Sequence, residues 1–190
     1  IELVTRKNHQ GVLAWLSLIE FQSLEILLPM IFEKGEDPLI IAINGVSDVR
    51  NFGAIVRSAE CLGAHTVVIP AKGSARITAD AVKTSAGALH TLPVCRESSI
   101  VKAVQFMKES GLKVITAVEK SGDIVSETDL NGPLVVIMGS EDKGISPELT
   151  ALADRQVRIP MKGGISSLNV SVAAGIILYE IARQRSQIRR

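Results

Sequence analysis

The fold is indicated most clearly by the stretch LVVIMGSEDKGISPELTAL at residues 134–152, which reads as a strand, a loop and the start of a helix. Residues 134–138 are all apolar, as in a strand buried on both faces of a parallel sheet. Ser146 followed by Pro147 is the pattern of a helix N-cap with proline at the first helical position, so residues 139–145 form the connecting loop. Open α/β sheets bind ligands beyond the carboxyl ends of their strands, which makes this loop a candidate site.

The same alternation of apolar β-branched runs and amphipathic stretches continues along most of the chain and predicts an α/β domain. The expected strands are residues 39–43, 66–69, 113–118, 134–138 and 156–159, with a weaker candidate at 91–94. The expected helices are residues 23–34, 52–62, 99–109, 147–152 and 169–185.

Composition limits the class of protein. With 190 residues, 46% of them hydrophobic, the chain can bury one sizeable core. The 21 basic and 20 acidic residues nearly cancel, so any affinity for RNA must come from local patches. Cys61 and Cys95 lack the spacing of a zinc or disulfide framework, and the three histidines form no ligand cluster, so we expect no metal. We expect no membrane span and a cytoplasmic location.

The loop at residues 139–146 excludes two nucleotide-binding classes. It nearly spells a phosphate-binding P-loop, but Ile145 stands where the essential lysine belongs, so an ATPase is excluded. The glycine-rich GxGxxG turn of nicotinamide enzymes and of the common methyltransferase fold is absent. Taken alone, the loop is equally compatible with a plain turn between a strand and a helix.

Two further segments place polar residues at helix starts. Asn51 and Arg57 are polar exceptions in residues 51–59, and a guanidinium there can hold a phosphate with two hydrogen bonds, although an exposed helix arginine is the commoner meaning. Residues 159–175 form a glycine-containing loop leading into a helix that is apolar on almost every side. Ser167 and Asn169 lie where free backbone N–H groups favour a polar or anionic ligand, or they act only as helix caps.

Together these three segments resemble, in order and spacing, the three motifs of the SpoU/TrmH class of the SPOUT superfamily, the RNA ribose 2′-O-methyltransferases. The resemblance covers about residues 39–181, and residues 8–12 also look like the family's start of this domain. It implies an open, mostly parallel sheet with helices on both faces and a C-terminal trefoil knot. It also implies S-adenosylmethionine as the cofactor.

The resemblance also implies the site residues. The catalytic positions fall on Arg57, Asn51, Glu141, Ser167 and Asn169. The cofactor would lie near Ala117, Gly139, Ile159 and Leu168. Arginine, with a pKa above about 12, is a poor proton acceptor, so we expect Arg57 to hold a phosphate and stabilise negative charge on the ribose oxygen. Asn51 would orient Arg57 or the ribose, and Glu141 is expected mainly to hold the loops together. Asp142 departs from the glycine common in relatives, which leaves substrate preference open.

The expected partners follow from the same resemblance. The substrate is structured RNA, with 23S-type rRNA and guanosine preferred; a tRNA enzyme and a non-catalytic RNA-binding or ribosome-assembly module are the alternatives. A homodimer is expected because the final helix would expose Leu168, Val172, Ile176 and Leu178. We interpret residues 1–37 as the end of a linker from an N-terminal RNA-binding domain and residues 38–190 as the catalytic domain. The arginines at the end of the chain offer some phosphate contacts.

Overall fold

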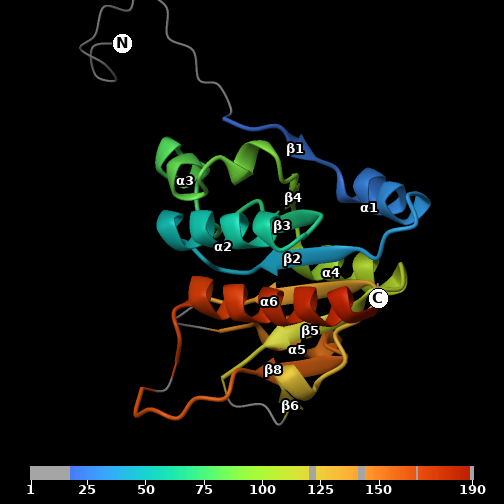
Figure 1. Ribbon diagram of the computed structural model, residues 1–190. Helices are drawn as coiled ribbons and strands as arrows, with labels where there is room; N and C mark the ends of the chain where they lie inside the picture. The colour runs from blue at the N-terminus through green and yellow to red at the C-terminus, as the bar shows by residue number, and fades with distance from the viewer. Residues whose placement is uncertain (1–17, 120–122, 141–143, 166, 189–190) are drawn as a thin grey trace, which may run out of the picture.

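The computed structural model describes residues 18–119, 123–140, 144–165 and 167–188, with side chains as far as residue 186. Its strands are β1 (Phe21–Gln22), β2 (Leu39–Ile43), β3 (Thr66–Pro70), β4 (Val94–Glu97), β5 (Lys113–Ala117), β6 (Asp123–Ile124), β7 (Leu134–Met138) and β8 (Arg155–Arg158). Its helices are α1 (Leu24–Glu33), α2 (Val49–Cys61), α3 (Ala79–Thr84), α4 (Ile100–Glu109), α5 (Pro147–Leu152) and α6 (Val170–Ile188), with 3₁₀ turns at Ala88–His90 and Val125–Glu127. The predicted α/β class is confirmed (Figure 1).

The strands form one sheet in the order β1-β4-β3-β2-β7-β5-β8-β6, and the paired strands are parallel throughout. At its centre β2 pairs with β7, from Leu39 opposite Leu134 to Ile43 opposite Met138. All strands therefore end on one side of the sheet, which we call the carboxyl side, and begin on the other, the amino side. The carboxyl side lies at the left of Figure 1, where the arrow of β2 points.

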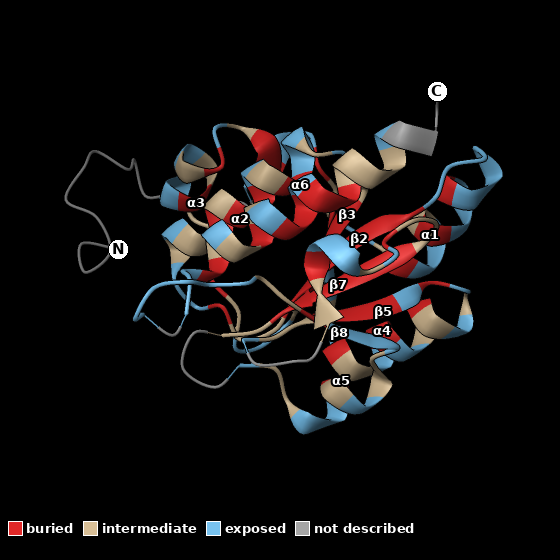
Figure 2. Cartoon of the chain, turned by 60° about the horizontal axis from the view of Figure 1, so that its bottom comes forward, coloured by how far each residue is buried: buried red, intermediate tan, exposed pale blue. Residues whose placement is uncertain are grey.

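Helices cover both faces of the sheet because the central strands are apolar on both faces. In β2, Leu39, Ile41 and Ile43 pack into a core shared with α2, α3 and α6. Ile40 and Ala42, which point the other way, pack into a core shared with α1, α4 and α5. Figure 2 shows the buried strands between helices whose outer faces are exposed. The expected open parallel sheet with helices on both faces is confirmed.

Two strands and one helix were not expected from the sequence, namely β1, β6 and α3, and the weaker strand expected at residues 91–94 instead lies at Val94–Glu97 as β4, because residues 88–90 form a 3₁₀ turn. α3 has six residues, begins at an N-cap, Thr78, and packs directly on the backbone of α2. A Cβ at Gly53 of α2 would lie 2.8 Å from Cβ of Thr84 and 2.9 Å from the carbonyl oxygen of Ala81, so a larger residue would push the two helices apart. Glycine at this position is what permits the close approach.

The segment before residue 38 contributes to the same structural unit. Phe21 of β1 pairs with Val94 of β4, and the guanidinium of Arg96 lies 3.8 Å from the centre of the Phe21 ring. Leu24 and Leu28 of α1 are buried in the core. Residues 1–17 lie outside the described part of the chain, so the interpretation of residues 1–37 as a linker stays a prediction.

Helix α6 exposes a row of apolar side chains, as expected, but one member of that row differs from the expected one. Leu178, expected on the surface, is only 1% exposed, because it lies on the core face together with Ile181. Tyr179 takes its place in the stripe and is 61% exposed, alongside Val172 and Ile176. The helix therefore has one buried face and one apolar exposed face rather than an apolar surface all round.

Two arginines of the last helix are engaged within the molecule rather than extended for phosphate binding. Arg183 donates two hydrogen bonds to the carboxylate of Glu180, at 2.8 and 2.7 Å. Arg185 donates to the carbonyl oxygens of Asp37 and Gly132, at 2.9 and 2.6 Å, and so joins loops on the amino side. The last two arginines of the chain lie outside the described residues.

The family knot stays a prediction from the resemblance, since the confirmed feature is the parallel α/β fold class. Among the described helices, none combines the length and the apolar content that crossing a bilayer would require.

Candidate active site

The first predicted site residue, Asn51, lies in the first turn of α2. Asp48 caps this helix: its carboxylate accepts a hydrogen bond of 2.8 Å from the backbone N–H of Asn51. The cap fixes the start of the helix on the carboxyl side of the sheet, directly after β2. The side chain of Asn51 is half-buried and is directed toward α6.

Asn169 sits immediately before α6 and joins the two helix starts. Its Oδ1 accepts hydrogen bonds from the backbone N–H of Ser171 at 2.9 Å and from the Ser171 hydroxyl at 2.6 Å. These bonds orient the amide of Asn169 so that its Nδ2 donates to Oδ1 of Asn51, at 2.9 Å. Two predicted catalytic residues that are 118 positions apart in the sequence are thus in direct contact.

A pocket of about 630 Å³ opens beside this pair, at the ends of β5, β7 and β8 and the start of α6. The four predicted cofactor residues all line it: Ala117, Gly139, Ile159 and Leu168. Ser167, predicted as catalytic, lines it too. The lining is largely apolar and comes from three successive strand ends, and its volume is within the range of about 300–1,000 Å³ usual for small-molecule sites.

Gly139 shapes the wall of the pocket after β7. A Cβ at this position would overlap the carbonyl carbon of Gly144, so only glycine fits. The loop folds back on itself there: Ser140 donates to the carbonyl of Gly144 at 3.2 Å, and Gly144 donates to the carbonyl of Ser140 at 2.9 Å. Gly144 has a φ of +63°, a left-handed conformation that favours glycine. This tight loop brings its backbone polar groups to the edge of the pocket.

Among the described residues predicted as catalytic, only Ser167 lines the pocket; Asn51 and Asn169 lie beside it, and Arg57 is placed elsewhere. Arg57 lies on the exposed face of α2 and is not part of the pocket lining. It forms no ion pair with any described residue, so its guanidinium is available to another molecule. Glu141 falls outside the described residues.

The sequence reasoning missed several lining residues, of which Glu119 carries the most chemistry. Glu119 follows β5 and is the only charged side chain among the described residues that line the pocket. Gln156, Met138 and Met161 line it as well. Their position next to strand ends on the carboxyl side was a usable signal, but no motif marks them. In the described part of the chain, no group of three or more His, Cys, Asp or Glu residues is arranged to hold a metal ion.

Comparison with known proteins places this pocket in a family context. The chain matches the model of the SpoU rRNA Methylase family over residues 38–179. It is 34% identical over 181 residues to a putative TrmH family tRNA/rRNA methyltransferase of Bacillus subtilis, covering 95% of this chain and 73% of that protein. It is 38% identical over 179 residues to a 23S rRNA (guanosine-2′-O-)-methyltransferase of Photobacterium profundum, covering 94% of this chain and 72% of the relative.

Some relatives are considerably longer than this chain. The chain is 42% identical to an uncharacterized tRNA/rRNA methyltransferase of Mycobacterium sp. (strain KMS), and the match covers 93% of this chain but only 56% of that protein.

The fold of the chain is also similar to those of solved methyltransferase structures. The SpoU methyltransferase AviRb of Streptomyces viridochromogenes, in complex with AdoMet, superposes with a TM-score of 0.73 at 32% identity, covering 80% of this chain and 62% of that one. The TrmH/SpoU tRNA modifying enzyme of A. aeolicus superposes with a TM-score of 0.74 at 29% identity, covering 86% of both chains.

Proposed function

Because the chain belongs to the SpoU rRNA methylase family, we propose that it transfers a methyl group from S-adenosylmethionine to a ribose 2′-hydroxyl in structured RNA. The observation that carries the proposal is the pocket at the ends of β5, β7 and β8 with the Asn51–Asn169 hydrogen bond beside it. One site for a small cofactor and one cluster of polar groups thus lie next to each other on the carboxyl side of the sheet.

The pocket has the properties that S-adenosylmethionine requires. Apolar side chains such as Ile159 and Leu168 suit the faces of an adenine ring, and the folded loop at Gly139 presents backbone groups to its polar edge. The carboxylate of Glu119 supplies negative charge that complements a cationic ligand. The bound cofactor carries a methyl group that its positive sulfur makes electrophilic.

The polar residues have separate roles in this proposal. Asn51 and Asn169 hold each other in place and orient the ribose at the mouth of the pocket. Arg57 binds the phosphate next to the target ribose and stabilises negative charge on the 2′-oxygen, whose proton passes to the solvent. Ser167 shapes the cofactor end of the site. Glu141 is proposed, on the resemblance alone, to hold the loops around the cofactor.

The proposed enzyme is a homodimer in which Arg57 acts at the partner's pocket. Val172, Ile176 and Tyr179 form an exposed apolar stripe along α6. α6 packs on α2, where a Cβ at Gly175 would lie 3.7 Å from the Ser58 hydroxyl, so the stripe borders the face of α2 that carries Arg57. A symmetric interface over this stripe would bury it and bring Arg57 near the second copy. This arrangement explains why Arg57 does not line the pocket of its own chain.

The proposed substrate is 23S-type rRNA with guanosine at the target position. The similarity to a 23S rRNA (guanosine-2′-O-)-methyltransferase supports this choice. A tRNA is the second candidate, favoured by the superposition on a TrmH/SpoU tRNA modifying enzyme over 86% of both chains. Either RNA implies action in the cytoplasm.

The experiment is methyl transfer from S-adenosylmethionine carrying a labelled methyl group to unmodified 23S rRNA and to unmodified tRNA, followed by digestion to nucleosides. Labelled 2′-O-methylguanosine from rRNA is the expected product. Label in tRNA alone would support the second candidate. Cofactor binding without transfer to either RNA would instead support a non-catalytic RNA-binding module and contradict the proposed activity.

A further inference from the structure

The loop between β3 and α3 presents two basic side chains on the carboxyl side of the sheet. Lys72 and Arg76 are both exposed, whereas Ala75 between them is only 3% exposed. The loop has the sequence AKGSARI at residues 71–77 and contains no aromatic or acidic residue. Its exposed chemistry is therefore almost entirely positive charge.

Three hydrogen bonds hold this loop against the sheet and against the segment that leads into α2. The N–H of Ala71 donates to the carbonyl of Glu97 at 2.8 Å, and the hydroxyl of Ser74 donates to the carbonyl of Pro70 at 3.0 Å. The N–H of Ala75 donates to the carbonyl of Val46 at 2.9 Å. Val46 lies in the short connection between β2 and α2, so the loop is fixed next to the helix that carries Asn51 and Arg57.

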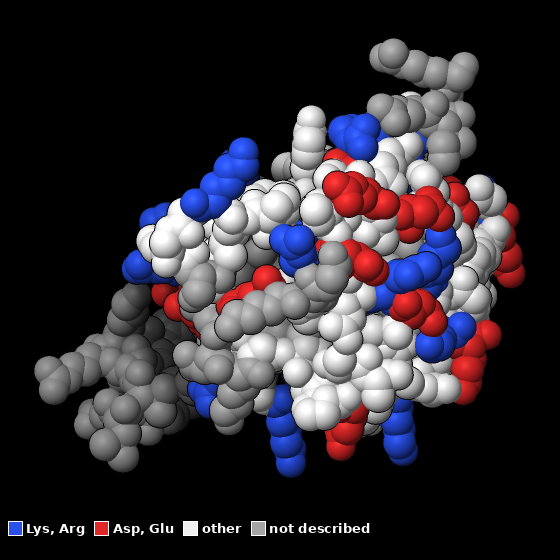
Figure 3. Space-filling model, turned by 90° about the horizontal axis from the view of Figure 1, so that it is seen from below, with Lys and Arg blue, Asp and Glu red and all other residues white. Residues whose placement is uncertain are grey.

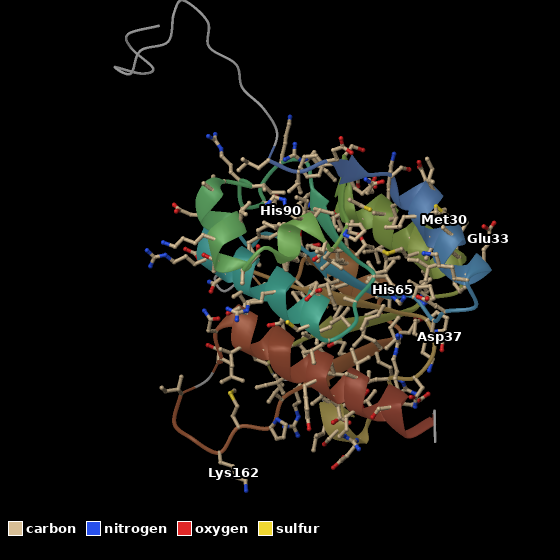
Figure 4. All side chains as sticks on the ribbon, turned by 45° about the horizontal axis from the view of Figure 1, so that its top comes forward. Met30, Glu33, Asp37, His65, His90 and Lys162 are labelled. Atoms are coloured by element: carbon tan, nitrogen blue, oxygen red, sulfur yellow. The ribbon has the colours of Figure 1, made fainter. Side chains whose placement is uncertain are left out.

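Neither basic side chain of the loop is neutralised by a neighbour that the structure describes. Lys72 and Arg76 form no ion pair there, whereas Lys108 and Lys113 each contact an aspartate. Seen from below in Figure 3, acidic and basic side chains lie side by side at the right, on the amino side, and both kinds are also present at the left. In Figure 4, Lys162 likewise projects from the loop before α6, away from the rest of the molecule.

We propose that Lys72 and Arg76 bind backbone phosphates of the RNA beyond the phosphate that Arg57 binds. The inference rests on the proposed function and names the surface that holds the substrate outside the reacting centre. Lysine and arginine are the residues that bind phosphates, lysine as a point charge and arginine through two parallel hydrogen bonds. Because the loop has no aromatic side chain for stacking, its contribution is affinity that does not depend on base sequence.

The rigidity of the loop strengthens this assignment. A mobile loop would lose conformational entropy when it bound RNA, and part of the binding free energy would be spent on ordering it. Here the backbone at Ala75 is already fixed by its hydrogen bond to Val46, so mainly the two side chains have to be ordered. The loop therefore sets the distance between its phosphates and the helix start at Asn51.

The test measures how RNA affinity depends on salt concentration. The double variant Lys72→Gln/Arg76→Gln and wild type are titrated with a labelled RNA hairpin by fluorescence anisotropy, across about 50–200 mM salt, where phosphate contacts weigh heavily. The control, Lys34→Gln/Lys113→Gln, removes the same charge from the amino side. Affinity for S-adenosylmethionine is measured in parallel by calorimetry and should stay within about twofold in all three proteins.

We expect the slope of log affinity against log salt to fall by about 1–2 in the Lys72/Arg76 variant, because each lost phosphate contact removes about 0.7–0.9. The control should keep the wild-type slope. Equal slopes in the two variants and wild type would overturn the inference while leaving the methyltransferase proposal intact. RNA binding by wild type that does not depend on salt concentration would overturn it in the same way. If the slopes are as expected but wild type transfers no methyl group to either RNA, the proposed activity is rejected and the inference about Lys72 and Arg76 stands.

Discussion

The amino and carboxyl sides of the sheet hold the same kinds of charged residue in different ways. On the amino side, Lys113 contacts Asp129 at 2.8 Å and Lys108 contacts Asp154 at 2.7 Å. On the carboxyl side, the basic residues of the β3–α3 loop have no such partner among the described residues, and neither does Arg57 further along α2. Charges paired inside the molecule contribute to its structure, and charges without a partner are available to a ligand.

His65 illustrates how polar groups on the amino side pair with one another. Its Nδ1 accepts a hydrogen bond of 3.0 Å from the backbone N–H of Leu39, so the ring proton must be on Nε2, which donates to Glu36 at 2.8 Å. Figure 4 shows His65 close to Asp37 in the region where β2 begins. The carboxyl side instead has the pocket and the exposed cations of the β3–α3 loop.

The largest expected effect comes from Arg57→Ala. Removing a positioned charge that acts on the transition state costs about 10²–10³ in rate, and affinity for S-adenosylmethionine should stay within about threefold. Single-turnover kinetics and calorimetry measure the two quantities. An equal loss of cofactor affinity would place Arg57 in the cofactor pocket and contradict the separation of roles.

The proposal that Arg57 acts at the pocket of the partner subunit can be tested with the same variant. Gly139→Val should close the pocket of its own chain, because a Cβ there meets the backbone of Gly144. Neither variant alone should be active, but a mixture allowed to exchange subunits should recover activity, since one of its two sites combines an intact pocket with an intact arginine. No recovery in a mixture that demonstrably forms mixed dimers would show that Arg57 acts within its own chain.

A smaller effect is expected from Asn169→Ala. This change removes both the cap of α6 and the contact with Asn51, and loss of a helix cap typically costs about 1 kcal/mol of stability. The affinity for S-adenosylmethionine and the turnover rate should both fall, each by about tenfold, which corresponds to a loss of about 1.4 kcal/mol in each case. Ser99→Ala, which removes the cap of α4 on the opposite face, is the control and should lower stability alone. Full activity of Asn169→Ala would remove Asn169 from the site.

Glu119→Gln should weaken binding of S-adenosylmethionine more than binding of its product, S-adenosylhomocysteine. The cofactor carries a positive sulfur, whereas S-adenosylhomocysteine does not, so a carboxylate in the pocket wall favours the former. An exposed charge pair contributes about 0.5–1 kcal/mol, which corresponds to about twofold to fivefold weaker cofactor binding in the variant. Calorimetry with both ligands measures this, and Glu109→Gln outside the pocket is the control. Equal weakening of the two ligands would contradict a role for the charge.

The smallest effect tests the amino side, through Asp129→Asn. Hydrogen bonds from Lys113 and then from Asn131 lower the pKa of Asp129 from 3.8 to about 2. A lowered folded-state pKa contributes stability above the unfolded-state value and loses it as pH falls from about 4 to about 2. The difference in Tm between wild type and variant should therefore shrink across that range. Glu33→Gln, at an exposed position on α1, is the matched control; a difference independent of pH would contradict the pairing.

The sequence was sufficient for the central architecture because the strongest signal is local. β2 and β7 are continuous apolar runs, and the Ser146–Pro147 pair marks the start of α5. β1 and α3 were missed because they are too short for periodicity and depend on distant contacts, such as the packing of α3 on Gly53.

From the sequence we could predict some of the residues that line the pocket, but not Glu119, and not the geometry of the pocket. The four expected cofactor residues do line one pocket, because they follow strands that end on the same side of the sheet. The contact between Asn51 and Asn169 joins segments that no sequence spacing relates. That Arg57 and Asn51 point in different directions could be predicted from helical periodicity. Six residues are about 1.7 turns, which places the two side chains on different faces of α2.

Hydrogen exchange measured by mass spectrometry, with and without S-adenosylmethionine and an RNA hairpin, tests most directly whether ligands bind on the carboxyl side. We expect the cofactor to protect backbone amides at residues 117–119 and 159–165, and RNA to add protection at residues 44–48 and 71–77. Amides on the amino side, at residues 34–38 and 128–133, should exchange at unchanged rates with either ligand. Protection confined to the amino side, with none at the ends of β2, β3, β5 and β8, would contradict the account.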